Sequence, residues 1–519
     1  GGDRRSQAEE SVREFSQSQL KRETGVDEAT IRSIAAMLTR SKRPLVIAEG
    51  LNCSDPHAAK TAAAANLLCS MFPGSRSLID FADYSSLSLA SPLARVGELA
   101  ERMNRGEVDL LLLDGVNPVF HLPAAWGFSK GMKAVPMTVS FSSAPDDTAE
   151  YAKLVLPTHT FYETWGDYSP RAGVRSILQP TMGPLWDSRP LEDILISTGK
   201  TLGGEKNFPW KDSYELLREA WTQGKSESDA EAFWQESVMR GGRWPEETRQ
   251  APSSAGAAPA AKGPFPPTGP LTPPPRPGTG FSFMTYPTIQ FYDGRTANRP
   301  FLQELPDPMT QVTWGGWIEV NPQTAWNNKI KKGDVLRLKS RYGVVEAPAF
   351  LYQGIPENVL AMPIGQGHAS GGRYTKNDTG NPAQVIPSVL DPESGGLYWS
   401  VSGVTIEKTG KFLEVANVDG SMYQHGRGIA QSLDMSLYRK GIGDKPDLVM
   451  PLPEGYKKEV DFYPAHVHDE YRWSMVIDLD RCIGCGACVV ACYAENNVPW
   501  VGKKTNLMKR RMSWLQIER

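Results

Sequence analysis

Short apolar runs alternate with amphipathic segments through the first 200 residues of the chain. Four of these runs lack polar alternation, which predicts strands buried on both faces of a sheet: 44–50, 108–115, 136–143 and 152–158. Residues 29–40 repeat apolar positions at helical spacing, and Asp55-Pro56 opens a second, alanine-rich helix over 56–71. Because strands that alternate with helices form parallel, doubly wound sheets, this region is predicted to be α/β.

The pattern becomes that of a β protein after residue 280. Short runs separated by Gly, Asn and Pro turns predict four strands: 317–320, 334–340, 343–352 and 359–365. Strands of this length and spacing predict a compact β-barrel. One more strand is predicted at 472–480, directly before a cluster of cysteines.

A Pro- and Gly-rich stretch separates the two patterns. Residues 251–280 contain ten Pro and five Gly, and their only charged residues are Lys262 and Arg276. Such a stretch cannot build a core, so we expect a linker that is partly polyproline II. The predicted organisation is an α/β domain, this linker, a β-barrel, an irregular connector and the start of a cysteine-bearing domain: 1–250, 251–280, 281–410, 411–470 and 471–519.

Charge and apolar content exclude two classes of protein. The 519 residues carry 56 basic and 59 acidic side chains, which argues against a nucleic-acid partner. No apolar run reaches the roughly 18 residues that a spanning helix needs, so no transmembrane segment is predicted. The sequence opens on GGDRRSQAEE and closes on SWLQIER, and we expect it to be an internal fragment of a longer polypeptide.

The main chemical signal is the stretch RCIGCGACVVACYAEN at 481–496. Its four cysteines have the spacing C-x₂-C-x₂-C-x₃-C, by which bacterial ferredoxins hold iron–sulfur clusters, and the fourth cysteine of such a run ligates a different cluster from the first three. We therefore predict that one cluster is ligated by Cys482, Cys485 and Cys488. Cys492 is predicted to ligate a second cluster, completed by cysteines outside this sequence.

A structural zinc site is the alternative interpretation of these cysteines. Zinc sites typically bring two separated Cys or Cys/His pairs together around one tetrahedral ion. Here three cysteines stand close together, and the small residues Gly484, Gly486 and Ala487 between them let the backbone fold tightly around a cluster. The spacing favours iron–sulfur.

Three regions of the sequence resemble molybdopterin oxidoreductases and their partner subunits. VDLLLLDGVNPVFHLP at 108–123, together with the stretch 152–180, resembles the third domain of these enzymes. Residues 315–368, with their NP…GDVLRLKSRYG pattern, resemble the C-terminal dinucleotide-binding domain, which implies a double-psi-type β-barrel. Residues 472–504 resemble the four-cluster ferredoxin subunits of the same enzymes, which implies a 4Fe–4S ferredoxin-like domain.

Both parts on one chain, in this order, resemble the iron–sulfur subunit of alternative complex III, a bacterial quinol-oxidising respiratory complex. The resemblance implies a molybdoenzyme-like scaffold without its cofactor, and a complete subunit with three 4Fe–4S clusters and one 3Fe–4S cluster. It implies as partners a multihaem cytochrome c, a monohaem cytochrome c and polytopic quinol-binding membrane subunits. It also implies a peripheral position on the periplasm-facing side of the bacterial inner membrane. The amino-terminal molybdoenzyme domains and the later cysteine runs of the family are absent from this sequence.

Three loops fall where active relatives line a pterin cofactor, because open α/β sheets bind ligands beyond the carboxyl ends of their strands. These loops, 115–121, 157–168 and 363–374, contain six candidate pterin contacts: Asn117, Thr160, Glu163, Gln366, His368 and Arg373. The alternative is that they are satisfied polar residues in a closed, vestigial cleft. We favour the alternative, because the fused arrangement belongs to a cofactor-free lineage.

The predicted function is electron transfer. Clusters would pass single electrons between a quinol site in membrane partners and a cytochrome or other acceptor. Quinol oxidation itself is expected on another chain, so no catalytic residue is assigned here. The alternative is a catalytic molybdopterin oxidoreductase of the polysulfide, thiosulfate or tetrathionate reductase type.

Overall fold

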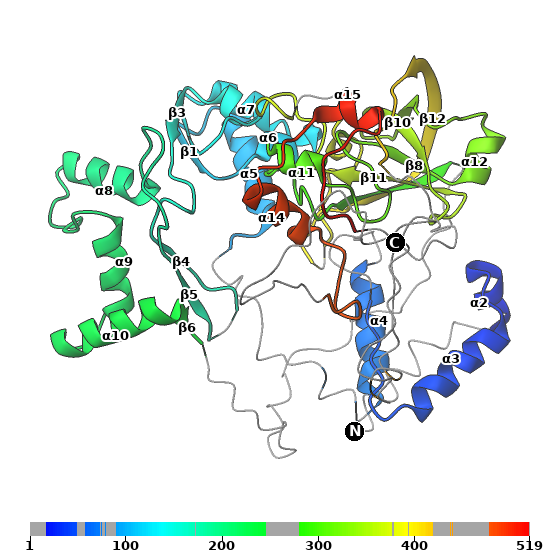
Figure 1. Cartoon of the computed structure of the whole chain (residues 1–519), viewed down its shortest axis with the longest axis horizontal. Helices are drawn as coiled ribbons and strands as arrows, with labels where there is room; N and C mark the ends of the chain where they lie inside the picture. Colours follow the sequence, from blue (N-terminus) through cyan, green and yellow to red (C-terminus); the bar gives the residue numbers. More distant parts are fainter. Residues whose placement is uncertain are drawn as a thin grey trace, which may run out of the picture. The chain divides into compact units, whose positions relative to one another are not determined.

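The computed structural model describes most of the chain outside the predicted linker and connector. The described residues are 17–48, 58–72, 74, 78, 90–171, 173–244, 280–375, 378–392, 394–418, 436, 439 and 477–517. The chain divides into a larger unit, Gly1–Asn298 with Gly315–Leu413, and a smaller unit, Arg299–Trp314 with Glu414–Arg519 (Figure 1). Nearly all of the predicted linker 251–280, and most of the predicted connector 411–470, lie outside the described residues. The predicted domain boundaries stay a prediction.

The described part of the larger unit begins with the helices α2 Gln17–Thr24, α3 Glu28–Arg40, α4 Ala58–Ser70 and α5 Leu93–Asn104. The Asp27 side chain caps α3 by accepting the Thr30 backbone N–H at 2.8 Å. The predicted strand 44–50 is wrong over 44–48, which is not extended into a sheet. The backbone of Val46 bonds instead to a side chain of α4. Its N–H donates to the Cys69 thiol at 3.1 Å, and the thiol donates to the Val46 carbonyl at 3.3 Å.

A three-stranded parallel sheet follows, in the order β1-β2-β3: β1 Leu110–Asp114, β2 Met137–Ser142 and β3 Leu154–Pro157. These strands confirm three of the predicted runs. Burial on both faces was wrong for β1, because Leu110 and Leu112 are 55% and 49% exposed while Leu111 is 6% exposed. It was also wrong for β3, where Leu154 and Val155 are 39% and 42% exposed. Helices α5 and α7, Phe128–Ala134, pack their apolar residues against the buried face (Figure 1).

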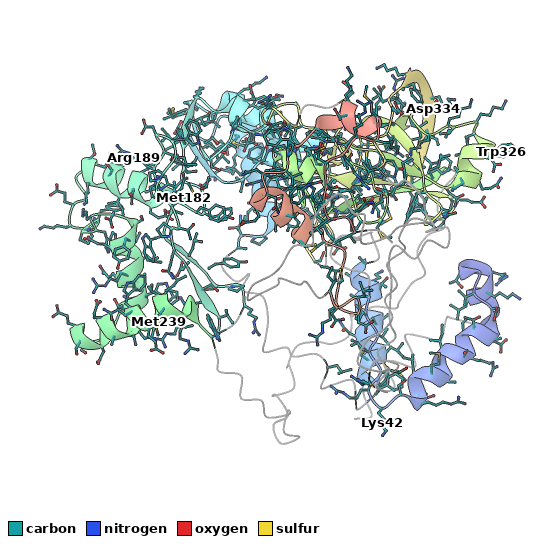
Figure 2. The ribbon with its side chains drawn as sticks, viewed as in Figure 1. Lys42, Met182, Arg189, Met239, Trp326 and Asp334 are labelled. Atoms are coloured by element: carbon teal, nitrogen blue, oxygen red, sulfur yellow. The ribbon has the colours of Figure 1, made fainter. Side chains whose placement is uncertain are left out.

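Short elements lie between the strands of this sheet: α6 Pro118–His121 and η3 Ala124–Trp126 between β1 and β2, and η4 Ala149–Tyr151 between β2 and β3. A small antiparallel sheet and a helical region follow β3. The sheet consists of β4 Gly166–Tyr168, β5 Arg175–Leu178 and β6 Gly242–Arg243. The helices are α8 Leu191–Thr201, α9 Ser213–Thr222 and α10 Glu227–Arg240. Ile177, Trp221 and Trp234 form the core of this region. Figure 2 shows Met239 on the exposed side of α10.

A closed six-stranded barrel confirms the predicted β region. Its strand order is β10-β8-β11-β7-β12-β9. The strands are β7 Phe281–Pro287, β8 Ile318–Val320, β9 Asp334–Lys339, β10 Val344–Leu351, β11 Val359–Ile364 and β12 Ser400–Phe412. Phe283, Leu336 and Leu360 are completely buried in its interior. Helix α12, Pro322–Asn327, and η5, Pro382–Gln384, lie between the strands in sequence, and Figure 2 shows Trp326 of α12 facing outward.

The smaller unit consists of short helices and loops in its described part. It contains α11 Pro300–Glu304, α14 Ala487–Glu495 and α15 Gly502–Leu507. The predicted strand 472–480 is wrong over its described part, 477–480, because the Asp478 carbonyl closes a turn by accepting the N–H groups of Arg481 and Cys482. In the part of the chain that the structure describes, every helix is too short or too polar to cross a membrane.

Candidate functional site

The four cysteines of the smaller unit occupy a loop and the helix that follows it. Cys482 and Cys485 precede α14, whereas Cys488 and Cys492 lie one turn apart on α14 itself. Residues four apart lie on the same side of a helix. The buried residues of α14 are Val489 and Tyr493, so the helix is fixed by one side while the thiol-bearing residues stay exposed or half-buried.

The loop turns through two glycines with left-handed backbone. Gly484 and Gly486 both have φ of +70°, a conformation that costs other residues energy. Gly486 also lies against Leu305, because a Cβ at this position would stand 2.6 Å from Leu305 Cδ1. At Gly484 the nearest atom to such a Cβ is Pro308 Cβ, at 3.5 Å. The path of the loop past Cys485 therefore depends on glycine on both sides.

The chemistry of these donors fits an iron–sulfur cluster. All four cysteines of the run are free thiols, and cysteine thiolates are the usual ligands of such clusters. Within the described ranges, no three His, Cys, Asp or Glu side chains are gathered closely enough to hold a metal ion. The division of the ligands between Cys482, Cys485 and Cys488 on one cluster and Cys492 on another stays a prediction.

A second group of polar side chains lies in the larger unit, around Asp147. Asn117, at the start of α6, donates from Nδ2 to Asp147 Oδ2 at 3.0 Å. His368 Nδ1, in the loop after β11, lies 2.6 Å from the same oxygen. Asp147 Oδ1 accepts the backbone N–H groups of Ala369 at 2.7 Å and Ser370 at 3.0 Å. Two of the six predicted pterin contacts are thus brought together, and both are bound to Asp147.

This group is buried and strongly polarised. Asn117, Asp147 and His368 are 8%, 4% and 8% exposed. Burial by itself raises the pKa of Asp147, but hydrogen bonds from His368, the Ser370 N–H and Asn117 outweigh it and lower the pKa to about 2. The His368 ring stacks on Phe120 with a centroid distance of 3.8 Å. The carboxylate therefore stays ionised and holds its donors in place.

Further contacts join the α/β region to the barrel within the larger unit. The Asn381 amide donates to the Phe120 carbonyl at 2.7 Å, and the Trp126 indole donates to the Ser388 carbonyl at 2.7 Å. His121 Nε2 lies 2.8 Å from the carbonyl oxygen of Asp293, and burial lowers the pKa of His121. These contacts fix the loops that carry Asn117 and His368.

The remaining predicted pterin contacts are distributed differently. Glu163 Oε2 accepts from the Thr160 N–H at 2.8 Å and the Thr160 hydroxyl at 3.0 Å. Glu163 Oε1 accepts the Leu185 N–H at 2.8 Å, and the hydrogen bonds from the Leu185 and Thr160 N–H groups lower the pKa of Glu163. Gln366 is 1% exposed, whereas Arg373 is exposed and lies over the Tyr374 ring. Four of the six residues therefore bond within this chain in ways that favour the closed-cleft interpretation.

Sequence reasoning missed the central residue of the group. Asp147 lies in the loop after β2, at the carboxyl end of a parallel strand, in the stretch SSAPDDTAE. Two consecutive acidic residues at this edge of a sheet are the signal that could have pointed to it.

Comparisons with known families match both parts of the chain. A family model described as "Molydopterin dinucleotide binding domain" matches residues 275–398. A second, described as "4Fe-4S binding domain", matches residues 473–494, which include the four cysteines up to Cys492.

Curated relatives repeat this division. The menaquinone reductase molybdopterin-binding-like subunit of Nitratidesulfovibrio vulgaris is 24% identical over 76% of this chain and 57% of its own length. The iron–sulfur cluster-binding subunit of menaquinone reductase from the same organism is 52% identical over 9% of this chain and 18% of its own length. The thiosulfate reductase molybdopterin-containing subunit PhsA of Salmonella typhimurium is 24% identical over 54% of this chain and 40% of its own length.

The chain joins a molybdopterin-oxidoreductase-like region to an iron–sulfur segment. The relatives support the mixed α/β and barrel fold and the iron–sulfur chemistry predicted from the sequence. The chain spans a little over half the length of the molybdopterin-binding-like subunit and less of the other two relatives. We call residues 477–517 the iron–sulfur segment below.

Proposed function

We propose that the chain is part of an electron-transfer iron–sulfur subunit of a membrane-bound respiratory complex that exchanges electrons with quinones. The observation that carries this proposal is the fusion itself. Two regions that resemble two separate subunits named for menaquinone reductase stand on one polypeptide. A molybdoenzyme-like region followed along the chain by a 4Fe–4S segment supports a redox role for the chain.

The finer proposal is the iron–sulfur subunit of alternative complex III, a complex that oxidises quinol. Its partners would be a multihaem cytochrome c, a monohaem cytochrome c and polytopic quinol-binding membrane subunits. Its position would be peripheral, on the periplasm-facing side of the bacterial inner membrane. The order of the two regions along the chain supports this proposal. The name of the relatives supports the quinone class of partner but describes reduction of menaquinone.

The residues of the chain would hold and tune the clusters. Cys482, Cys485 and Cys488 would ligate one cluster, and Cys492 a second. A bound iron–sulfur cluster accepts and releases single electrons, with a potential set by burial and by hydrogen bonds to its sulfurs. The chain itself would supply the thiolates and the rigid support for the loop that carries them.

The molybdoenzyme-like region would act as a scaffold that does not bind a pterin. The support comes from hydrogen bonds that the predicted pterin contacts make within the chain. Asn117 and His368 are bound to Asp147, and Thr160 is bound to Glu163. A carboxylate buried with its donors already paired gains little by exchanging them for a ligand.

A catalytic molybdopterin oxidoreductase is the second candidate. The match of residues 275–398 to a dinucleotide-binding family and the similarity to a thiosulfate reductase subunit favour it. In that case Gln366, His368 and Arg373, which lie in the matched range, would face the cofactor.

Metal analysis of the intact complex separates the two candidates. The electron-transfer proposal expects iron and acid-labile sulfide, with no stoichiometric molybdenum or tungsten. One molybdenum or tungsten per complex, with an extractable pterin, would instead establish the second candidate. Assays of the membrane-bound complex with a quinol and with a quinone then decide the direction. Faster quinone reduction than quinol oxidation would contradict the assignment to alternative complex III.

A further inference from the structure

A buried carboxylate, Glu304, connects separate stretches of the smaller unit. Glu304 is the last residue of α11 and is 4% exposed. Its Oε1 accepts four hydrogen bonds: from the Trp314 indole at 2.9 Å, from the N–H of Val501 at 3.1 Å, from the N–H of Gly502 at 2.7 Å and from the Asn506 amide at 2.8 Å. A buried charge is tolerated only where such donors surround it.

The residues beside Glu304 contact the neighbours of two predicted cluster ligands. The Phe301 ring stacks on Tyr493, which follows Cys492, with a centroid distance of 5.7 Å. Leu305 lies against Gly486, which follows Cys485. The same short helix is therefore fixed on one side to 501–506 and supports, on the other, the loop and helix that carry the thiols.

The residue after Glu304 belongs to the same core as α14. Tyr493 is 4% exposed and lies in this core together with Leu305, Val489 and Val498. Leu305 is thus part of the immediate support of α14.

We propose that Glu304 is the positioning residue of the iron–sulfur segment. Its carboxylate fixes α11 against residues 501–506, and α11 in turn holds the loop after Cys485 and the helix that carries Cys488 and Cys492. Glu304 does not ligate iron. This role deepens the proposed function and rests on it, because it matters for electron transfer only if the segment binds a cluster.

Three single variants and one double variant separate the contributions of Glu304. Glu304→Gln keeps an acceptor oxygen but removes the charge, and Glu304→Ala removes both. Asn506→Asp places a second carboxylate against Glu304 in a fully buried position, since Asn506 is 1% exposed. The double variant Glu304→Gln with Asn506→Asp exchanges the amide and the carboxylate and restores a complementary pair.

Glu495→Gln is the matched control. Glu495 is an exposed residue of α14, three positions after Cys492, so this variant removes the same charge near the cluster without removing the four hydrogen bonds. All variants are made in the intact complex, because this sequence holds three predicted ligands of one cluster and one of another. The readouts are the iron and sulfide content, the paramagnetic resonance spectrum of the reduced cluster, and hydrogen exchange over 486–507 in chain prepared without iron.

In Glu304→Ala we expect hydrogen exchange over 486–507 to become at least about tenfold faster, because several buried N–H groups lose their acceptor. We also expect the cluster content to fall and its resonance to broaden. Glu304→Gln should lie between Glu304→Ala and the unmodified chain, and Glu495→Gln should match the unmodified chain. Asn506→Asp should be as damaging as Glu304→Ala, and the double variant should recover part of the loss.

Two results would overturn the proposal. One is a Glu304→Ala chain that matches Glu495→Gln in every readout. The other is faster exchange with an unchanged cluster content and spectrum, which would make Glu304 a stabilising residue only. Failure of the proposed function is distinguishable, because an intact complex that contains no iron contradicts electron transfer while hydrogen exchange of the iron-free chain still reports on Glu304.

Discussion

Asp147 in the larger unit and Glu304 in the smaller unit are both buried carboxylates with four hydrogen-bond donors, yet their surroundings differ. Asp147 collects the side chains of Asn117 and His368, which the sequence predicts to be cofactor contacts. Glu304 accepts hydrogen bonds from donors such as the Gly502 N–H and the Asn506 amide, none of which is a predicted cluster ligand. The nearby cysteines are exposed or half-buried. Asp147 is therefore bonded to candidate ligand-binding side chains, whereas Glu304 is not bonded to the candidate ligands of its own unit.

The comparison shows which side chains are accessible to a ligand or a cluster in each unit. In the larger unit, Asn117 Nδ2 and His368 Nδ1 are bound to Asp147, whereas His368 Nε2 is buried without a hydrogen-bond partner. In the smaller unit, the apolar residues of α14 are buried and the thiols are not. The following changes test this contrast, from the largest expected effect to the smallest.

Replacing single cysteines should remove whole clusters. In the intact complex, Cys485→Ser should abolish one paramagnetic signal and Cys492→Ser a different one, because the fourth cysteine of such a run ligates another cluster. Cys69→Ser is the control, since this buried thiol bonds to Val46 in the larger unit. Loss of the same signal in both variants would contradict the split assignment.

Asp147→Ala should strongly destabilise the larger unit. The change leaves the Asn117 amide, His368 Nδ1 and two backbone N–H groups without their acceptor. We expect the free energy of unfolding to fall by about 3–5 kcal/mol, measured by urea denaturation. Asp109→Asn, at an exposed position before β1, should change it little. A small loss at Asp147 would mean that the polar groups around it are free to bind a ligand.

Gly486→Ala should disturb the cysteine loop more than Gly484→Ala. Both positions have φ of +70°, so both variants strain the backbone equally. Only Gly486→Ala also drives a methyl group to 2.6 Å from Leu305, and overpacking of this kind costs about 1–3 kcal/mol. Thermal unfolding and iron content should both rank the two variants in this order. Equal effects would show that Leu305 does not support the loop.

The stabilising role of Asp147 should depend on pH. Its pKa is lowered to about 2 in the folded chain, so the carboxylate contributes stability above its ordinary pKa of 3.8. This contribution should be lost as the pH falls from about 4 to about 2, and it amounts to about 2 kcal/mol. The difference in free energy of unfolding between the unmodified chain and Asp147→Asn should therefore shrink over this range. A constant difference would mean that the charge of Asp147 is not what the group requires.

Much of the fold could be predicted because periodicity reports local structure. The three sheet strands and four of the six barrel strands follow from apolar runs bounded by turns. Strand β12 was missed because its register shifts between Val401 and Val404, which breaks the two-residue alternation. The exposure of Leu112 was missed because the sequence does not reveal which face of a sheet the helices cover.

The candidate sites differ in the same way. The cysteines could be found from the sequence because the spacing between them, over a short stretch of chain, is typical of iron–sulfur ligands. Asp147 and Glu304 could not be found from the sequence, because their hydrogen-bond partners lie far away along the chain. His368 is 221 positions from Asp147, and Asn506 is 202 positions from Glu304. Such groups become visible only when the fold brings the stretches together.

Arg373 offers the finest test of the comparison, since it is a predicted pterin contact that is exposed, with its guanidinium 5.5 Å from the Tyr374 ring centroid. An exposed arginine over an aromatic ring contributes little, so Arg373→Ala should change the free energy of unfolding by less than about 1 kcal/mol. Asn117→Ala, which removes a buried donor and acceptor, is the contrast and should cost more. If the larger unit is a scaffold, neither variant alters the metal content of the complex. A loss of molybdenum or tungsten in Arg373→Ala would show that Arg373 contacts a bound pterin cofactor. The scaffold proposal for the larger unit would then be wrong.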